Sequence, residues 1–478
     1  MYYYVLEFIM ENMFSWLDEQ IDANLIPTIA DFVRIPNQSR QYDQEWDTNG
    51  LQQKACNFCI DWANKLDIEG LTLELIEEEG KTPVVLGILD SPNKSTVLMY
   101  GHIDKQPPLT EAWNEDLHPY KPVIKNNKLY GRGAADDGYA FFSSLLMVKA
   151  LQKFGFPHNR IVFFFETDEE SGSRDLLYYL EKMKPQIGEP SLVICLDSGC
   201  CDYENMCITT TLRGNMLFRV KAQVCNEGLH SGDASGIVPD SFRILRDIME
   251  GFEDRKNGRL ISDLYVNIPP DKYKQAYEFI QAVGGKLEKN FPFTGDCKPV
   301  ETDGFKQYMN RIWQPTLTLT GIDGVPHMNV AGNVLRPYTT LHYSLRLPPT
   351  LNRNDAIKYV ENYFKNVEPL CGAQISFELV RAGQGFSCPE YKADIESVIN
   401  EASHRFFGKK PLYFGEGGSI PFINELTVKF PNAQFIVTGV LGPESNAHGP
   451  NEFLHLPYLK KIVLSLTSIL QGYNNCKA

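Results

Sequence analysis

The sequence contains no uncharged hydrophobic run that approaches the ~18 residues of a membrane span. Its amino terminus, MYYYVLEFIMENMFSWLDEQ, is apolar but lacks the basic region and small-residue cleavage site of a secretion signal. Basic charge is also in deficit, because 46 Lys and Arg stand against 60 Asp and Glu, for a net charge of −14. No basic stripe is available to match nucleic-acid phosphates. We therefore expect a soluble, cytoplasmic protein that binds neither membrane nor nucleic acid.

The cysteines lack the paired spacing of a structural metal site. There are 11 of them, scattered along 478 residues, which suits reduced thiols in a reducing compartment. Cys56 and Cys59 form a C-x-x-C, but no second pair answers it, and SGCCDYENMC also lacks metal-ligand spacing. Because Ala55, Phe58 and Trp62 repeat around them with helical spacing, we predict the buried face of a helix there rather than a redox pair.

Two kinds of strand pattern divide the chain. Near-continuous apolar runs at 96–104, 160–168 and 191–199 are typical of strands covered on both faces, and a helical pattern at 138–155 lies between them. The same style returns after about residue 387, with a predicted helix at 391–407 and a strand at 433–440. We predict an α/β fold with a central, mostly parallel sheet, built from a discontinuous domain at 1–207 and 385–478.

The middle of the chain alternates apolar and polar residues, as strands with one solvated face do. Such strands are expected at 213–224, 316–322, 339–347 and 375–380, with helices at 240–253 and 353–367. The resulting order β-α-β-β-α-β predicts a ferredoxin-like α+β domain inserted at 208–384. The piece from about 258 to 314 interrupts this order, and we predict a loop with one helix there.

Acidic residues and histidines follow the apolar strands at the points where the strands end. In open α/β sheets, sites form just beyond the carboxyl ends of strands. The residues placed there are His102, Asp104, Asp136, Glu169, Glu170, Asp197 and His448. Carboxylates crowded in this way need a counter-charge, and two divalent cations would supply it. Imidazole and carboxylate ligands together suit Zn²⁺ best, and Mn²⁺ is possible.

Seven motifs in order make the sequence resemble a known family. They are GHID, GRGAADD, ETDEESGS, CLDSG, GLHSG, GEGGSIP and AHGPNE. They resemble the two-metal exopeptidases that include glutamate carboxypeptidase, succinyl-diaminopimelate desuccinylase and the cytosolic nonspecific (carnosine-type) dipeptidases. The resemblance spans nearly the whole chain and is strongest to the dipeptidase branch. It implies hydrolysis of small dipeptides, with the 1–207 and 385–478 domain as the catalytic, metal-binding part.

The resemblance implies a role for each residue at the strand ends. His102 and Glu170 would bind metals on opposite sides of the pair, together with Asp197 and His448, and Asp136 would bridge. Asp104 would orient His102. Glu169 would be the general base, taking a proton from the bridging water and passing it to the leaving amine. In the family, Asp at position 197 accompanies aminopeptidases and dipeptidases, whereas Glu accompanies carboxypeptidases and deacylases.

The residues themselves also favour Glu169 as the base. Adjacent residues in a turn after a strand project in different directions, so Glu170 can face a metal while Glu169 faces substrate. A ligand must stay ionised, but a base works best when its pKa lies near the working pH. Glu166 and Asp168 receive no role beyond hydrogen bonding.

The inserted domain would supply substrate contacts and a second subunit. By resemblance, His230 polarises the substrate carbonyl of the neighbouring subunit's site, and Arg346 grips the substrate carboxylate. The other implied substrate contacts are Asn333, Glu416, Gly417, Gly418 and Ser419. The implied assembly is a homodimer through the 208–384 domain, which would serve as lid and dimerisation domain.

Two local features concern the turn after the bridging aspartate. The family commonly has a cis peptide just after this residue, so we expect one between Asp136 and Asp137. The family often continues Asp-x-Lys-Gly, but this chain has Asp137-Gly138-Tyr139. The missing lysine leaves the metal set intact and puts the local packing around it in doubt.

Two alternatives to a dipeptidase stay open on the sequence. The first is an N-acyl-amino-acid or carbamoyl amidohydrolase on the same site, which Asp197 disfavours. The second is a catalytically silent scaffold, which the presence of Glu169 and all five ligands disfavours. The nature of the preferred dipeptide is open at this stage.

Overall fold

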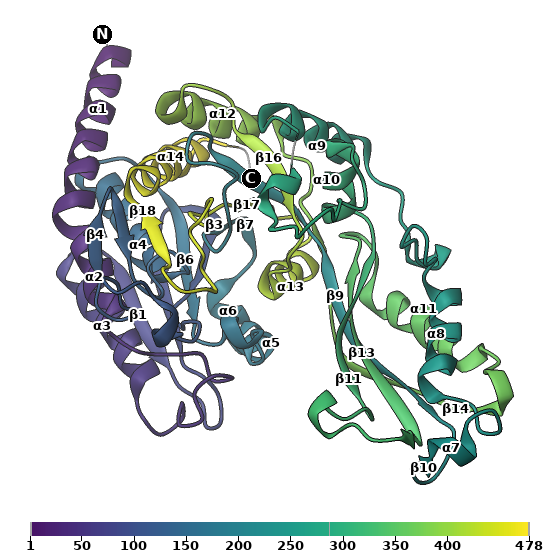
Figure 1. Ribbon diagram of the computed structural model, residues 1–478. Helices are drawn as coiled ribbons and strands as arrows, with labels where there is room; N and C mark the ends of the chain where they lie inside the picture. The colour runs from purple at the N-terminus through teal and green to yellow at the C-terminus, as the bar shows by residue number, and fades with distance from the viewer. Residues whose placement is uncertain (1, 286, 477–478) are drawn as a thin grey trace. The chain divides into compact units, whose positions relative to one another are not determined.

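The computed structural model describes residues 2–285 and 287–476, and the chain folds into two compact units (Figure 1). Unit 1 comprises residues 1–209, 388–413 and 425–478, and unit 2 comprises 210–387 and 414–424. Unit 2 therefore includes the segment 414–424, which the sequence analysis grouped with the flanking domain. Within the described residues, no helix is long and apolar enough to cross a membrane.

A six-stranded, mostly parallel sheet lies at the centre of unit 1, in agreement with the predicted fold class. Its order is β1-β2-β6-β3-β7-β17, and β3, β6, β7 and β17 run parallel. The strands are β1 (Leu71–Ile76), β2 (Val84–Leu89), β3 (Asn93–His102), β6 (Asn159–Glu166), β7 (Pro190–Cys195) and β17 (Gln434–Val437). Strand β6 is buried along almost its whole length because its residues Phe163, Phe164 and Phe165 are covered on both faces.

Helix α4 (Gly138–Lys153) packs on β3 and is itself surrounded by helices of the same unit. Its Phe142 ring meets the rings of Phe32, Phe58 and Trp62 edge to face, at centroid distances of 5.0–6.0 Å. Its neighbours include α1 (Tyr2–Gln20), α2 (Ile26–Val33), α3 (Leu51–Lys65) and α14 (Leu456–Tyr473). Cys56 and Cys59 lie on the buried face of α3, as the helical spacing predicted.

The remaining helices and short strands of unit 1 connect these layers. The helices are α5 (Leu176–Lys182), α6 (Lys184–Ile187) and α12 (Ala393–Phe407), and α12 packs on α14. A small antiparallel sheet of order β18-β5-β4 joins β18 (Phe453–His455), β5 (Lys128–Tyr130) and β4 (Val123–Lys125). Because β18 pairs with β5, the segment after His448 lies beside the segment before Asp136.

Unit 2 contains the predicted β-α-β-β-α-β arrangement. Its antiparallel sheet has the order β11-β13-β9-β14, built from β9 (Gly214–Gln223), β11 (Thr316–Asp323), β13 (Tyr338–Leu347) and β14 (Gln374–Gly383). Helices α8 (Ser241–Phe252) and α11 (Arg353–Asn366) pack against it. Burial alternates strictly along β13, and the core gathers around Phe218, whose ring lies 5.6–5.8 Å from those of Tyr343, Phe364 and Phe377.

The interruption at 258–314 differs from its prediction. One helix was expected, but the segment contains two, α9 (Pro270–Ala282) and α10 (Gly304–Ile312). The two helices contact each other, and the Phe279 ring of α9 stacks on Tyr308 of α10 and on Phe414, with centroids 4.6 and 5.7 Å apart. Helix α10 was missed because it follows a stretch that contains Gly and Pro and because it buries only three residues, Tyr308, Met309 and Ile312. Three positions are too few to give a clear helical pattern in the sequence.

Shorter elements complete the chain. They are α7 (Ser231–Ala234), α13 (Pro421–Lys429), β8 (Cys207–Leu212), β10 (Leu229–His230), β12 (Val334–Leu335), β15 (Phe386–Ser387) and β16 (Leu412–Glu416). Strand β10 pairs with β12, and β8 lies between β15 and β16 in a three-stranded sheet.

Candidate metal centre

The carboxyl ends of the parallel strands bring the predicted metal ligands together. His102 is the last residue of β3, and in the parallel register it lies beside Glu166, the last residue of β6. Asp197 follows β7 by two residues, and Asp136 immediately precedes Asp137, the N-cap of α4. Because parallel strands end at one edge of the sheet, four chain segments present these side chains at a single rim.

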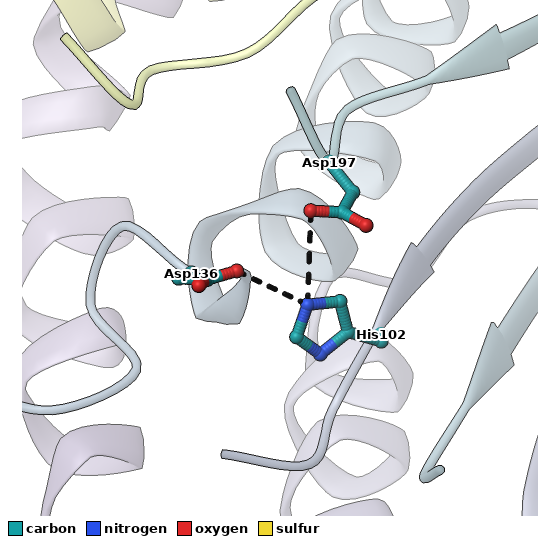
Figure 2. Close-up of side chains that lie close together, drawn as sticks. All are labelled: His102, Asp136 and Asp197. Carbon is teal, nitrogen blue, oxygen red and sulfur yellow. Dashed lines mark hydrogen bonds and ion pairs between the residues drawn. The ribbon is translucent and has the colours of Figure 1, made fainter. Parts of the chain in front are cut away.

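His102, Asp136 and Asp197 form a first group with mutually close ligand atoms (Figure 2). The Nε2 atom of His102 lies 3.2 Å from Asp136 Oδ1 and 3.8 Å from Asp197 Oδ1. The side chain of His102 is fully buried. We call this group position 1.

Asp136, Glu170 and His448 form a second group. The Nε2 atom of His448 lies 3.2 Å from Asp136 Oδ2 and 3.5 Å from Glu170 Oε2. Asp136 therefore turns one carboxylate oxygen to each histidine and belongs to both groups. His448 differs from His102 in that 66% of its side chain is exposed. We call this group position 2.

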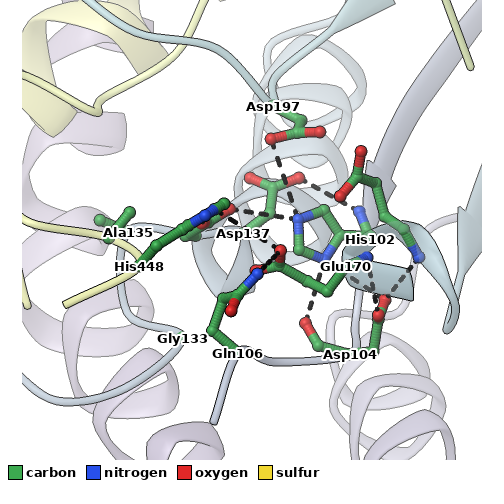
Figure 3. Close-up of polar contacts among 12 residues, drawn as sticks. His102, Asp104, Gln106, Gly133, Ala135, Asp137, Glu170, Asp197 and His448 are labelled. Carbon is green, nitrogen blue, oxygen red and sulfur yellow. Dashed lines mark hydrogen bonds and ion pairs between the residues drawn. The ribbon is translucent and has the colours of Figure 1, made fainter. Parts of the chain in front are cut away.

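Asp104 contacts two of the segments that form the rim (Figure 3). Its carbonyl oxygen lies 3.0 Å from His102 Nδ1 and can accept a hydrogen bond from that nitrogen, which directs Nε2 toward position 1. Its carboxylate accepts hydrogen bonds from the backbone amides of Glu169 and Glu170, at 3.2 and 3.1 Å. One residue thus orients a histidine through its carbonyl and the turn of the paired glutamates through its carboxylate.

The donor set at positions 1 and 2 fits a pair of divalent cations. Glu170 Oε1 is buried with no hydrogen-bond partner among the described residues, and Asp136 Oδ2, which faces His448, accepts no hydrogen bond either. A buried carboxylate oxygen without a partner is costly, and a cation would remove that cost. Two groups of three ligands that share one carboxylate match a dinuclear site with open coordination positions.

Glu169 lies beside these groups on a one-turn 3-10 segment, Glu169–Ser171. It is half-buried, whereas its neighbour Glu170 is buried. Burial raises the pKa of the Glu169 carboxyl well above its usual range, and the negative charge of Asp197 raises it further. A raised pKa is the property that a carboxylate needs to accept and release a proton near neutral pH.

Glu166 and Asp168 have hydrogen-bond and ion-pair partners away from the ligand atoms. The Glu166 carboxylate accepts from the hydroxyls of Tyr100 and Ser173, both at 2.8 Å. Asp168 Oδ1 lies 3.0 Å from Arg40 Nε. Burial raises the pKa of Glu166 to about 8. Both residues anchor the turn rather than facing the positions.

The turn after Asp136 contains the expected cis peptide, between Asp136 and Asp137. Gly138 follows, and a side chain there would collide with the carbonyl of Gly133, because a Cβ would lie 2.2 Å from that oxygen. In place of the family's lysine-glycine pair, Tyr139 donates a hydrogen bond to the carbonyl of Leu196, directly before Asp197. This tyrosine ties α4 to the strand end that carries a position 1 ligand.

Sequence reasoning left three side chains of the rim without a role. Gln106 donates a hydrogen bond to Glu170 Oε2, and Arg132 forms a buried ion pair with Glu452 at 2.8 Å. Arg132 and Glu452 belong to the motifs GRGAADD and AHGPNE, and Gln106 lies two residues after GHID. For Arg132 and Glu452, the available signal was a charged residue within a motif whose other residues were expected at the site. No signal of this kind marked Gln106.

The predicted substrate residues lie in unit 2, in two places. His230 and Asn333 are exposed and adjacent, since His230 pairs with Val334 across β10 and β12 and the amide of Ser231 donates to the Asn333 carbonyl at 2.9 Å. This pair precedes the start of β13. The ring of His230 lies 3.5 Å from Asp233.

Arg346 lies near the opposite end of β13, opposite Asn215 of β9 and Thr316 of β11. Nearby, Arg213 donates to the carbonyl of Gly417 at 3.3 Å and to the hydroxyl of Thr316 at 2.9 Å. Arg213 was not predicted, and burial with its neighbours Arg346 and Arg311 lowers its pKa to about 9. The segment of Glu416, Gly417, Gly418 and Ser419 therefore belongs to the Arg346 end of unit 2.

A family model described as Peptidase family M20/M25/M40 matches residues 98–472 of this chain. Relatives match over most of their length as well. The cysteinylglycine-S-conjugate dipeptidase of Corynebacterium striatum is 24% identical over 86% of this chain and 88% of its own. The Beta-Ala-His dipeptidase of Mus musculus is 25% identical over 86% of this chain and 85% of its own.

Solved structures share the fold. The dipeptidase Dug1p of Saccharomyces cerevisiae aligns with a TM-score of 0.73 at 22% identity, over 98% of this chain and 99% of its own. A metallo-carboxypeptidase from Sulfolobus solfataricus, described as M20 family, aligns with a TM-score of 0.78 at 18% identity, over 95% and 100%. The similarity therefore covers both units of the fold.

Proposed function

Because the chain belongs to peptidase family M20/M25/M40 and is thereby a metallopeptidase, we propose that it hydrolyses the peptide bond of small, unmodified dipeptides. The single observation that carries this proposal is the pair of ligand groups that share Asp136, with the base candidate Glu169 beside them. The dipeptidase activity of the relatives from Corynebacterium striatum and mouse supports the substrate class.

We assign five residues to two divalent cations. His102, Asp136 and Asp197 would hold one, and Asp136, Glu170 and His448 the other. When bound, such a pair would polarise the scissile carbonyl and make an attacking water more acidic at neutral pH. Zn²⁺ is our first choice because imidazole and carboxylate ligands are mixed, and Mn²⁺ is the second.

The protein's own groups would carry the proton and hold the substrate. Glu169 would accept a proton from the attacking water and deliver it to the leaving amine nitrogen. Asp104 keeps the His102 ring in its tautomer and fixes the Glu169–Glu170 turn. Arg346 would bind the substrate's terminal carboxylate through its fork of N–H donors, with Ser419 and the amides of Gly417 and Gly418 beside it. Glu416 would bind the free α-amino group.

We propose that His230 and Asn333 act in the site of a second subunit. Along β13, Tyr338 and Arg346 are eight residue steps apart, or ~26 Å at the usual rise. His230 pairs with Val334, which precedes this strand. One substrate cannot touch both His230 and Arg346 of the same unit 2 at that separation. A partner's His230 removes the conflict.

The corresponding assembly would be a homodimer formed through the range 208–384. Large apolar side chains are exposed around β10 and β12, and they include Ile237, Met328 and Val330 at 82%, 86% and 74% exposure. Exposed apolar residues gathered on one part of a surface mark interaction sites. A two-fold contact there would cover the same residues of both copies.

We also propose a cytoplasmic location. All 11 cysteines are free thiols, and Cys297 and Cys371 are exposed. Exposed free thiols are suited to a reducing compartment.

The test is a substrate panel on chelated protein reconstituted separately with Zn²⁺ and Mn²⁺. We expect hydrolysis of Ala-Gly-type and Cys-Gly-type dipeptides and little turnover of N-acetyl or N-carbamoyl amino acids. Preferential turnover of N-acetyl or N-carbamoyl amino acids would indicate an amidohydrolase instead of a dipeptidase. Uptake of two ions without Glu169-dependent turnover of any amide would indicate a silent scaffold.

A further inference from the structure

A buried ion pair links the segments that carry the ligands of position 2. The side chains of Arg132 and Glu452 are 1% and 0% exposed, and Arg132 Nη1 lies 2.8 Å from Glu452 Oε2. Glu452 lies four residues after His448, and Arg132 lies four residues before Asp136. The pair therefore joins two parts of the chain that are 320 residues apart.

Glu452 organises the turn that ends at Asp136. Its carboxylate accepts three backbone hydrogen bonds, from the amides of Gly133 at 2.9 Å, Ala135 at 3.0 Å and Asp136 at 3.2 Å. A side chain that binds three amides of one turn sets the path of that turn. The position of the Asp136 carboxylate follows from this path.

Arg132 holds the chain on both sides of His448. Its guanidinium donates to the carbonyl of Ala447 and, at 2.7 Å, to the carbonyl of Gly449. Its Nε donates to the carbonyl of Pro107 at 3.0 Å, next to Gln106, which binds Glu170. The ion pair therefore binds backbone beside two ligands of position 2, Asp136 and His448. It reaches the third, Glu170, only indirectly, through Pro107 and the side chain of Gln106.

Position 1 shares Asp136 with position 2, but its other two ligands, His102 and Asp197, have supports of their own. His102 is held by Asp104 and by Asp137, which accepts from the His102 amide at 3.1 Å. The carbonyl before Asp197 is held by Tyr139. The two positions also differ in exposure, since the His102 side chain is fully buried and that of His448 is 66% exposed.

We propose that Arg132 and Glu452 are the positioning pair of position 2, and that position 2 is consequently the exchangeable one of the two metal positions. This inference rests on the proposed two-metal function. Without the pair, the backbone on both sides of His448 would lose its hydrogen bonds to Arg132, and the imidazole would no longer be held in one orientation. Position 2 would then keep only two ordered ligands. Residues that orient metal ligands typically change metal affinity about 10- to 100-fold.

The test is titration of chelated protein with Mn²⁺ alone, read by calorimetry and by the number of ions bound per chain. Wild type is expected to bind two. Arg132→Lys keeps the charge but cannot reach three carbonyls at once, so it should weaken one of the two binding events about 10-fold or more and leave the other unchanged. Glu452→Gln keeps the shape and should weaken the same event more than the other, because Asp136 is shared by both positions. It provides a second variant if Arg132→Lys folds poorly.

Reference variants identify which position is affected. In a His448→Ala background, Arg132→Lys should leave the affinity of the remaining ion unchanged. In an Asp197→Asn background, it should weaken the remaining ion about 10-fold or more, because that ion occupies position 2. Arg160→Lys is the matched control, since Arg160 also grips carbonyls, those of Gln186 and Ile187, but at the opposite end of β6.

The outcomes separate this inference from the proposed function. A wild type that binds two ions and hydrolyses dipeptides, with Arg132→Lys weakening both events equally or neither, would overturn the positioning role alone. A wild type that binds fewer than two ions would remove the proposed function itself. Restoration of Arg132→Lys turnover by excess Mn²⁺, absent in Arg160→Lys, would distinguish lost metal from general loss of stability.

A separate observation concerns two thiols, that of Cys201 in the loop that follows Asp197 and that of Cys207, the first residue of β8. Cys201 Sγ lies 3.2 Å from Cys207 Sγ, and the amide of Cys201 lies 3.3 Å from the same Cys207 sulfur. Cys201 is partly exposed and Cys207 is buried. A disulfide has an S–S distance of about 2.05 Å, so small side-chain movements would close this pair.

We infer that Cys201 and Cys207 form a reversible disulfide by exchange with a small-molecule disulfide. The Cys201 thiolate attacks one sulfur of the reagent and releases one thiol, which leaves a mixed disulfide on Cys201. The Cys207 thiolate then attacks the Cys201 sulfur and releases the second thiol. Two protein thiols are oxidised as one external disulfide is reduced to two thiols.

Treatment with oxidised glutathione, followed by alkylation and mass spectrometry, tests this inference. Wild type should lose two alkylatable thiols, weigh about 2 Da less than the reduced chain and recover with dithiothreitol. Cys207→Ser should instead retain a glutathione adduct on Cys201, and the exposed-site control Cys297→Ser should behave as wild type. A stable adduct on Cys201 in wild type, or unchanged alkylation of both thiols, would overturn the inference.

Discussion

The rim of unit 1 and the proposed substrate residues of unit 2 are organised in opposite ways. At the rim, five ligand candidates from distant chain segments meet in two groups, and most of them are buried. In unit 2, His230 and Arg346 lie toward the two ends of one strand, and His230 is exposed. A metal centre requires donor atoms fixed before the ion arrives, whereas substrate contacts can be completed by a second copy. Four experiments would sharpen or break this contrast.

The largest effect should come from the rim. Glu169→Gln removes the proton acceptor without removing a ligand, so we expect kcat to fall by about 10²- to 10⁴-fold while two ions stay bound. Turnover numbers and metal content per chain are the measurements. Glu181→Gln, at an exposed position on α5 of the same unit, is the matched control. Near-normal turnover in Glu169→Gln would exclude Glu169 as the base.

Arg346 should contribute to binding more than to chemistry. Arg346→Lys removes the bidentate fork, and we expect KM for a dipeptide to rise about 10- to 100-fold, with a smaller change in kcat. For wild type, KM should be higher for the dipeptide amide, which has no terminal carboxylate, than for the dipeptide. For Arg346→Lys, the two KM values should be similar. Arg219→Lys, on β9 of the same sheet, serves as the control. An equal loss for acid and amide substrates would show that Arg346 does not bind the carboxylate.

Mixing two inactive variants tests whether unit 2 acts across subunits. Equal amounts of His230→Ala and Glu169→Gln should regain about one quarter of wild-type activity, because half of the dimers are mixed and each has one complete site. Activity after unfolding and refolding the mixture together, with the molecular mass by light scattering, is the measurement. A fully active monomer, or no recovery from a mixture shown to contain mixed dimers, would contradict the trans arrangement.

The smallest effect concerns a buried charge behind the rim. Lys105 is fully buried and donates to the carbonyls of Phe32 and Ile35 at 2.8 and 2.6 Å, and burial lowers its pKa to about 7. The unfolded lysine titrates near 10.5, so between these values the unfolded chain binds more protons. The contribution of Lys105 to the free energy of unfolding should therefore rise with pH, by at most about 1.4 kcal/mol per pH unit.

Urea unfolding of wild type and Lys105→Met at pH 7, 8 and 9, both without metal, measures this contribution. The advantage of wild type over the variant should grow across that interval. Lys149→Met is the control, because Lys149 also donates to a carbonyl, that of Asp67, but lies partly exposed. A constant difference between wild type and Lys105→Met would show that the buried lysine does not titrate there.

Most strands and helices and the metal-ligand candidates could be predicted, because short-range sequence patterns determine them. Continuous apolar runs indicated β3, β6 and β7, strict alternation indicated β9 and β13, and helical spacing indicated α3 and α4. The segment 258–314 resisted prediction, since the helix α10 is short and its apolar positions are few. The ligands could be named because each follows a recognisable strand, and strand ends of a parallel sheet share one edge.

The supporting residues could not be identified in this way. Arg132 and Glu452 are 320 residues apart, and no periodicity relates them. Tyr139 lies where the family's lysine-glycine pair is missing, and its hydrogen bond to the carbonyl of Leu196 joins α4 to the segment after β7. Such long-range contacts depend on how distant segments pack together. A short-range sequence pattern does not contain that information.

The sequence by itself determined the chemistry of this protein, because residue types are sufficient to say that imidazoles and carboxylates at strand ends suit divalent cations. Tertiary structure alone decided the division of labour among them. It turned one oxygen of Asp136 to each histidine, buried His102 and exposed His448, and set Arg132 and Glu452 behind one position. The physical reason is that distance and burial, which set ligand geometry and exchange, arise only when remote segments are packed together.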